Sequence, residues 1–135
     1  MTFAATPELF WLTLTIVLTG ISAFPYVSEI LSTHGVKTAI SEGCGPPPNK
    51  AAWALRARRA HANAVENLVL FAPLVLMIVV MEQENKTTAL ACAVYYFARV
   101  AHYIVYLLSV GYVRTLLFGI SLAVVGVMVV RLFGY

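Results

Sequence analysis

Residues 56–71 read RARRAHANAVENLVLF, and this stretch decides how the rest of the chain is organised. Its first half is polar, and its second half begins a long apolar run. At 100° per residue, several of its polar side chains fall within about 100° of arc on one helix face. These are Arg56, Arg59, Asn63, Glu66 and Asn67. Arg58 and His61 point away from this polar stripe. Charged groups are costly in a membrane, so such a stripe leading into a membrane-length helix requires an explanation.

The composition is that of a membrane protein. Of 135 residues, 61% are hydrophobic and 11% are charged, whereas soluble domains carry about 25% charged residues. This length allows one domain over residues 1–135. The net charge is +3, but the cations flank apolar segments and form no surface for nucleic acid.

Cys44 and Cys92 are too few for a disulfide framework, and we expect a free loop thiol and a small core residue.

Four apolar segments are long enough to cross a membrane, because about 20 apolar residues span the hydrocarbon core. We expect membrane spans at about residues 7–31, 51–81, 88–109 and 113–133. Thr6, Pro7 and Glu8 predict the first helix start, with a hydroxyl cap, a first-turn proline and an acid near the positive end of the helix dipole. The sequence therefore predicts an all-α, integral membrane four-helix bundle.

Glycine and proline predict where the chain leaves its helices. Pro25 should kink the end of the first span and turn the residues after it towards a cavity. Residues 32–50 contain Gly35 and a triple proline, and we expect a loop there, either a cover over a site or a plain connector. After the second span, Thr87 and Thr88 are expected to cap the third.

The third span carries a second polar stripe. Arg99 is surrounded by apolar residues, and an ionisable group at such depth marks a pathway or a site by default. Its spacing places four polar side chains on one helix face. These are Tyr95, Arg99, His102 and Tyr106. A purely structural ion pair between Arg99 and Glu66 is the alternative. Gly111 is then expected to break the chain before Arg114 opens the fourth span.

The distribution of cations predicts the orientation. Basic residues concentrate in the loop between the first two spans and at the start of the second span, whereas the N-terminus holds none and the turn after the second span holds only Lys86. The concentrated set is Lys37, Lys50, Arg56, Arg58 and Arg59. By the positive-inside rule, we expect the first loop in the cytoplasm, the ends of the polar stripes towards the cytoplasmic side, and both termini outside. The N-terminus lacks the cationic region of a signal peptide, which favours a retained first span and a bacterial inner membrane.

The two stripes together suit a small zwitterion with several carboxylates. Guanidinium groups bind carboxylates in bidentate pairs, and Glu66 could bind an ammonium. The full set is Arg56, Arg59, Asn63, Glu66, Asn67, Arg99, His102, Tyr106 and Arg114. We expect no metal, because the histidines are scattered and the carboxylates do not cluster. A hydrolytic serine with its own base is not identifiable.

The sequence resembles the MAPEG family, the membrane-associated proteins in eicosanoid and glutathione metabolism. The family pattern on the second span is an arginine, then an asparagine four residues later and a glutamate three further on. Its third-span pattern is Arg-Val-Ala-His with a tyrosine four residues later, and an arginine opens the fourth span. The matching residues are Arg59, Asn63, Glu66, Arg99, His102, Tyr106 and Arg114. The resemblance covers essentially the whole chain.

The resemblance implies a homotrimer with three glutathione sites between subunits. Arg114 would be catalytic and favour the thiolate, which attacks a lipophilic electrophile or reduces a lipid hydroperoxide from the bilayer. Glutathione, the co-substrate, would be bound by Arg56, Arg59, Asn63, Glu66, His102 and Tyr106. Further candidates are Asn67, Arg99, Lys37 and Thr115. The implied partners are a second and third copy, glutathione, a hydrophobic electrophile and membrane lipids.

Several departures from the family pattern weaken any assignment to a specific eicosanoid synthase. The first span has no arginine, for which Lys37 is the candidate substitute. Ala62, Thr115 and Phe118 stand where some members have arginine, serine and tyrosine. A general glutathione transferase or peroxidase is therefore the preferred interpretation. A non-catalytic lipid-binding or scaffold protein of the same fold, and a small transporter, remain the alternatives.

Overall fold

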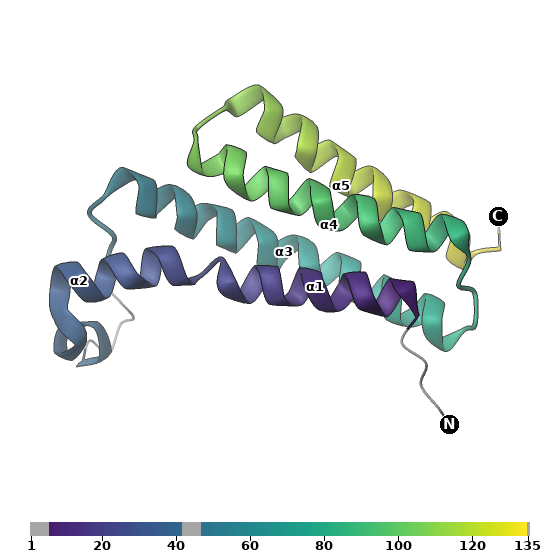
Figure 1. The fold of residues 1–135 in the computed structure, drawn as a ribbon, viewed down its shortest axis with the longest axis horizontal. Coiled ribbons are helices and arrows are strands. Elements are labelled where there is room, and N and C mark those ends of the chain that lie inside the picture. Colours follow the sequence, from purple (N-terminus) through teal and green to yellow (C-terminus); the bar gives the residue numbers. More distant parts are fainter. Residues whose placement is uncertain (1–5, 42–46, 135) are drawn as a thin grey trace.

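The computed structural model of the chain describes residues 6–41 and 47–134, and its regular elements there are five helices. They are α1 (Pro7–Ile21), α2 (Phe24–Ser41), α3 (Ala52–Val80), α4 (Lys86–Leu107) and α5 (Gly111–Leu132). Helices α1, α3, α4 and α5 run lengthwise beside one another, and α2 continues beyond the end of α1 (Figure 1). The start of α1 and the end of α5 lie at one end, and the α2–α3 connection lies at the other. The predicted all-α bundle is confirmed.

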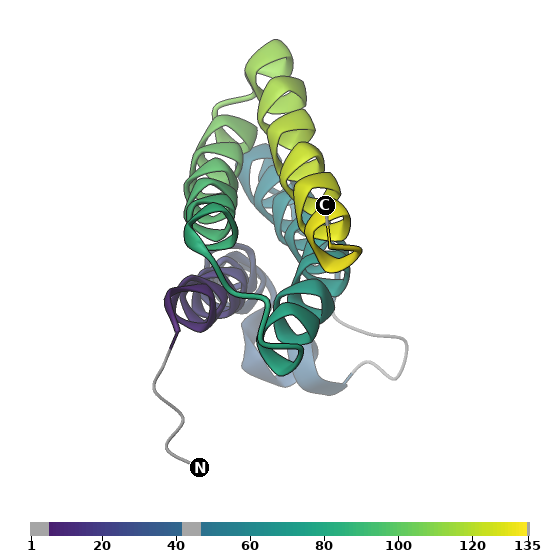
Figure 2. The same cartoon turned by 90° about the vertical axis from the view of Figure 1, so that its right-hand side faces the viewer.

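Four candidate spans in the described chain are long and apolar enough to cross a membrane. The first combines α1 and α2, and α3, α4 and α5 are the others. Seen from the end, α1, α4, α5 and α3 follow one another around the bundle (Figure 2). Both α3 and α4 contact α1 as well as α5. The two helices that carry the polar stripes therefore form the centre of the packing.

The start of α1 has the predicted cap. Thr6 is the N-cap residue, and its hydroxyl oxygen accepts a hydrogen bond from the Leu9 amide at 3.4 Å. Along the buried face of α1, Thr15 and Thr19 donate their hydroxyls to carbonyl oxygens one turn earlier, both at 2.8 Å. Such bonds allow polar side chains to be buried without leaving donors unsatisfied.

The break in the first span lies before the predicted kink at Pro25. The chain leaves the helix at Ser22, the C-cap residue of α1, and α2 begins at Phe24. A proline ring clashes with the carbonyl four residues earlier, here that of Ile21, and proline has no amide to donate. The helix therefore ends one turn before Pro25, which then occupies the first turn of α2, where proline is tolerated.

The loop predicted for residues 32–50 is wrong over its first half. Helical structure continues to Ser41, interrupted at Gly35, which has φ 78° and ψ 155°. A positive φ is readily adopted by glycine, so Gly35 joins two helical pieces rather than ending the helix. Pro47 to Lys50 are non-helical. The predicted loop thiol, Cys44, lies outside the described residues.

The apolar core fills the half of the bundle that holds the chain ends. It joins residues from α1, α3, α4 and α5, including Leu12, Val75 and Met128. At its centre the rings of Phe71 and Tyr95 are stacked, with centroids 3.7 Å apart. Cys92 is fully buried in this core, which confirms the prediction of a small core residue.

The connections on either side of α4 differ from the prediction in their capping residues. Asn85, rather than Thr87 or Thr88, is the N-cap residue, and Thr88 completes a capping box. The Thr88 hydroxyl also contacts the carboxylate of Glu8, which ties α4 to the start of α1. After α4, the residue with positive φ is Ser109 at 65°, while Gly111 is already helical.

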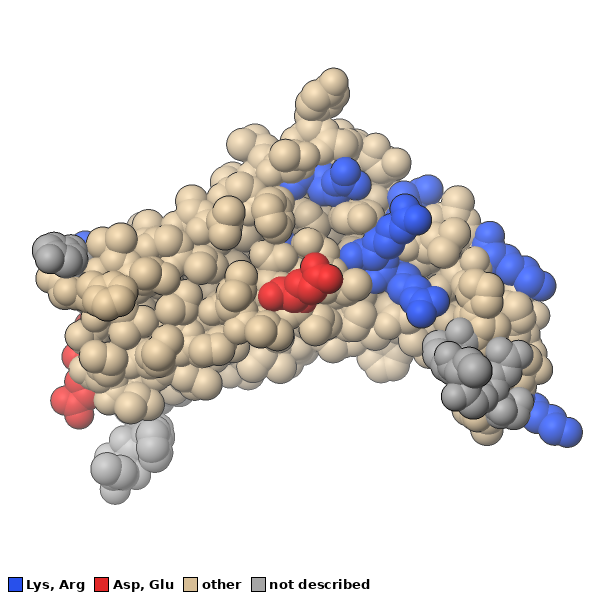
Figure 3. All heavy atoms as spheres, turned by 180° about the vertical axis from the view of Figure 1, so that it is seen from behind, with Lys and Arg blue, Asp and Glu red and all other residues tan. Residues whose placement is uncertain are grey.

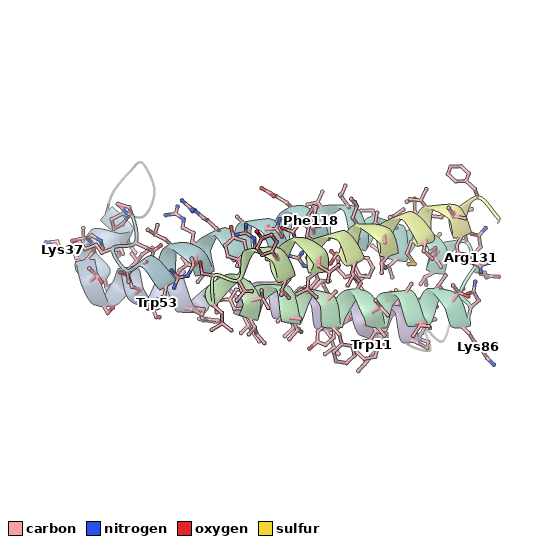
Figure 4. All side chains as sticks on the ribbon, turned by 90° about the horizontal axis from the view of Figure 1, so that it is seen from above. Trp11, Lys37, Trp53, Lys86, Phe118 and Arg131 are labelled. Carbon is pink, nitrogen blue, oxygen red and sulfur yellow. The ribbon has the colours of Figure 1, made fainter. Side chains whose placement is uncertain are left out.

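Charge is distributed unevenly along the bundle. Lysine and arginine side chains gather towards the end formed by α2 and the start of α3, and one acidic side chain lies beside them on the same face (Figure 3). The labelled residues Lys37 and Trp53 lie at that end, whereas Lys86 and Arg131 lie at the opposite end (Figure 4). The polar half of the molecule thus coincides with its basic end.

Candidate functional site

A cavity of about 310 Å³ opens between α3, α4 and α5. It is lined by Asn63, His102, Tyr106, Arg114, Thr115 and Phe118. Five of these six residues were candidates from the sequence, and Phe118 is the addition. The fixed period of each helix explains why spacing alone found the members on α3 and α4. Packing of the helices against one another then brings part of each stripe and the start of α5 to one place.

Arg114 occupies the first turn of α5. Its guanidinium carbon lies 4.8 Å from the centre of the Tyr106 ring, a cation–π arrangement. The Tyr106 ring in turn contacts His102, with ring centroids 5.7 Å apart. Because the guanidinium is held against an aromatic face, its position in the cavity is restrained while its N–H groups can still bind an anion.

Arg99 lies behind the cavity, with 3% of its surface exposed. Its Nη2 donates to Oδ1 of Asn63 at 3.0 Å, whereas its Nη1 has no hydrogen-bond partner among the described residues. Glu66, which a structural ion pair would require, is instead exposed on α3. The structure therefore contradicts an Arg99–Glu66 pair, and Arg99 orients the amide of a cavity-lining residue.

The other predicted residues of α3 occupy different environments. Arg56 is half-buried, and its Nε donates to the carbonyl of Leu107 at 2.9 Å, at the C-terminal end of α4. Arg59 is exposed, like Glu66, on the same face. Asn67 is buried, and its side-chain amide donates to the carbonyl of Asn63 at 2.8 Å. Within one chain, only part of the polar stripe on α3 therefore lines the cavity.

Lys37 does not line the cavity. It is exposed on α2, beyond the break at Gly35, at the far end of the molecule from Lys86 (Figure 4). Phe118, which lines the cavity, is well separated from it in the same view. Within one chain, the structure therefore does not bring Lys37 to the cavity.

The sequence did not identify Glu29 as a residue that organises this end of the bundle. Its carboxylate accepts hydrogen bonds from the backbone amides of Lys50 and Ala51 at 3.1 and 3.0 Å, and from the Asn49 side chain at 2.6 Å. These amides lie immediately before α3, whose N-cap residue, Ala51, makes no side-chain cap of its own. No motif or helical spacing in the sequence singles out Glu29, because its partners lie 20 to 22 residues further along the chain.

The comparisons with known proteins place the chain in one family. The chain matches the MAPEG family over residues 2–134. No curated protein and no solved structure matches it. This match covers nearly the whole chain, and the four candidate spans agree with a membrane location. The chain is therefore an integral, multi-pass membrane protein that belongs to the MAPEG family.

Proposed function

We propose that the protein is a membrane-bound glutathione transferase that joins the glutathione thiolate to lipophilic electrophiles, or a peroxidase that reduces lipid hydroperoxides. The observation that carries this proposal is the cavity in which Arg114 lies beside Tyr106, with His102 and Asn63 on the facing helices. Membership of a family that includes glutathione transferases supports it.

Glutathione has two carboxylates and one ammonium, and the residues around the cavity offer groups of opposite charge. Arg56 and Arg59 on α3 could bind carboxylates, and Glu66 on the same face could bind the ammonium. The exposure of Arg59 and Glu66 leaves them available to a ligand. We further propose that three copies assemble so that each site lies between two subunits.

Arg114 would supply the catalytic charge. The thiolate is the reactive form of glutathione, and a nearby cation lowers the pKa of a thiol from about 8.5 towards neutrality. In conjugation, the thiol proton goes to solvent, a carbon–sulfur bond forms, and the leaving group departs with its bonding electron pair. In hydroperoxide reduction, one glutathione attacks the terminal oxygen and releases an alcohol. A second glutathione then forms the disulfide and releases water.

The test combines binding and turnover with purified protein in lipid nanodiscs. Calorimetry should show saturable glutathione binding, and a chloronitrobenzene substrate should be consumed with glutathione present. Arg114→Ala should lower kcat by about 10²-fold, because it removes one charge-stabilising group. The matched control is Arg131→Ala, since Arg131 lies on the same helix but contacts Thr87 at the other end.

Two outcomes would contradict this proposal as a whole, and a third would contradict the role given to Arg114. An absence of binding heat at millimolar glutathione would favour a lipid-binding or scaffold role for the same fold. Substrate or proton flux in sealed vesicles that is lost on changing Glu66, without any turnover of glutathione, would favour a transporter. An equal loss of activity in Arg114→Ala and Arg131→Ala would remove the catalytic role from Arg114.

A further inference from the structure

The break between α1 and α2 exposes backbone carbonyls inside the bundle. The amide of Ala23 bonds to the carbonyl of Gly20 rather than to that of Thr19, and the helix ends at Ser22. Freed carbonyls within a membrane protein need donors from neighbouring helices. At this break, the donors come from α3 and α4, the two helices that also line the cavity with Asn63 and His102.

His61 is the donor from α3. Its Nδ1 lies 3.0 Å from the carbonyl oxygen of Thr19 and 2.9 Å from the hydroxyl oxygen of Ser22. The Ser22 hydroxyl donates its own hydrogen to the Thr19 carbonyl at 2.6 Å, and a carbonyl can only accept. The hydrogen of the imidazole therefore lies on Nδ1, shared between the two oxygens. The ring of Tyr26, from α2, also contacts His61 at 5.6 Å.

Tyr103 is the donor from α4. Its hydroxyl donates to the carbonyl oxygen of Ser22 at 3.1 Å. Ser22 thus receives hydrogen bonds from both helices, one at its hydroxyl oxygen and one at its carbonyl oxygen. Because the same residue anchors α3 and α4, the break fixes the rotation of each helix about its own axis.

The anchoring residues are direct sequence neighbours of cavity residues. His61 precedes Asn63 by two positions, which places the two side chains about 200° apart around α3. Tyr103 follows His102 by one position on α4, about 100° away. On each helix, one face therefore hydrogen-bonds to the break between α1 and α2, and a different face presents a polar side chain to the cavity. A rotation of either helix would change both contacts together.

We propose that His61 and Tyr103 are positioning residues that hold α3 and α4 in the rotation at which Asn63 and His102 face the cavity. Neither residue lines the cavity, and both act through the break at Ser22. This inference rests on the proposed glutathione site for its functional consequence. Its structural part, the anchoring of the break, is independent of that function.

Substitutions at His61 distinguish the two ring nitrogens. His61→Asn places an amide nitrogen near the position of Nδ1 and should preserve the anchor, whereas His61→Gln places it near Nε2 and should not. His61→Gln, His61→Leu and Tyr103→Phe should each raise the Kd for glutathione by about tenfold, because small displacements of binding groups are costly. Tyr96→Phe is the matched control, since Tyr96 lies on the same helix and packs against Trp11 and Phe97.

Hydrogen–deuterium exchange supplies a readout that needs no ligand. Amides at residues 19–24 should exchange faster in His61→Leu and Tyr103→Phe than in wild type, His61→Asn or Tyr96→Phe. Unchanged exchange in His61→Leu would overturn the inference, whatever the glutathione titrations show. Faster exchange with unchanged glutathione affinity would also overturn it, since positioning would then be absent. If wild type itself binds no glutathione, the proposed function fails, and the exchange data still decide whether His61 anchors the break.

Discussion

Arg99 shows how single side chains accommodate a charge at membrane depth. It has 3% of its surface exposed, and its bond to Asn63 spans 3.0 Å. A hydrogen bond to a charged group contributes about 1.5–3 kcal/mol. Asn63→Leu should therefore lower the free energy of unfolding by about 1.5–3 kcal/mol, since it leaves the guanidinium without this acceptor.

A double-mutant cycle with Arg99→Met measures the interaction directly. Unfolding is followed in mild detergent for both single variants and the double variant, and the coupling energy should be about 1.5–3 kcal/mol. Asn67→Leu is the control, because that amide donates to a carbonyl of its own helix. If Asn67 couples to Arg99 as strongly as Asn63 does, the assigned contact is wrong.

The cavity residues show what spacing can and cannot predict. Asn63, His102 and Tyr106 were found because residues on one helix face recur at a fixed period. The same period placed Arg59 and Glu66 with Asn63, yet both are exposed in the single chain. Which part of a stripe faces a neighbouring helix depends on how the helices rotate and pack, and this is not encoded in spacing along one helix.

Among the helices, the junction of α2 and α3 depends on one carboxylate. Glu29 accepts the backbone amides of Lys50 and Ala51, which otherwise have no partner within a helix. Glu29→Gln keeps the size of the side chain but replaces one acceptor oxygen with a donor and removes the charge. We expect a lower Tm and faster amide exchange at residues 50–55.

Thermal unfolding and amide exchange in nanodiscs measure this effect. Glu82→Gln is the control, since Glu82 is an exposed acid in the turn just beyond the other end of α3. If Glu29→Gln leaves exchange at the start of α3 unchanged, the carboxylate does not hold that helix end. An equal Tm loss in Glu82→Gln would indicate a general effect of charge.

The helix α2 also explains why the sequence prediction failed in this segment. Gly35 and the triple proline favour a loop by their intrinsic preferences. In the structure, tertiary contacts hold the segment instead. The Asn49 side chain donates to the carbonyl of Tyr26 at 2.8 Å, and Nε2 of His34 lies 3.2 Å from the carbonyl of Pro48. A local sequence pattern cannot predict contacts between residues this far apart in the chain, whereas the apolar composition of the long spans is sufficient to identify them.

At the scale of the whole molecule, the uneven charge predicts an orientation. The start of α1 and the end of α5 lie together, away from the basic end (Figures 1 and 3). By the positive-inside rule, both termini should face away from the cytoplasm. In a bacterial inner membrane, alkaline phosphatase fused to the C-terminus should be active, and a green fluorescent protein fusion should be dark. The opposite pair of results would reverse the orientation.

The position of Glu66 predicts self-association. Glu66 lies midway along α3, a helix of 29 residues, so it is about 21 Å from either end. An exposed carboxylate at that depth is costly against lipid, and such groups face a protein interior or a water-filled space instead. A second copy of the chain that covers this face of α3 would remove the cost and would complete the site with Arg59.

Two measurements on protein in nanodiscs test this assembly. Native mass spectrometry should give a trimer, three times 14.7 kDa. Oxygen dissolves in lipid, so a spin label that faces lipid collides with it often. A label at Glu66→Cys should collide with oxygen rarely. A label at Leu116→Cys should collide often, because Leu116 is an exposed apolar residue on α5. A monomer whose label at position 66 is as accessible to oxygen as the label at 116 would contradict both the assembly and a site shared between subunits.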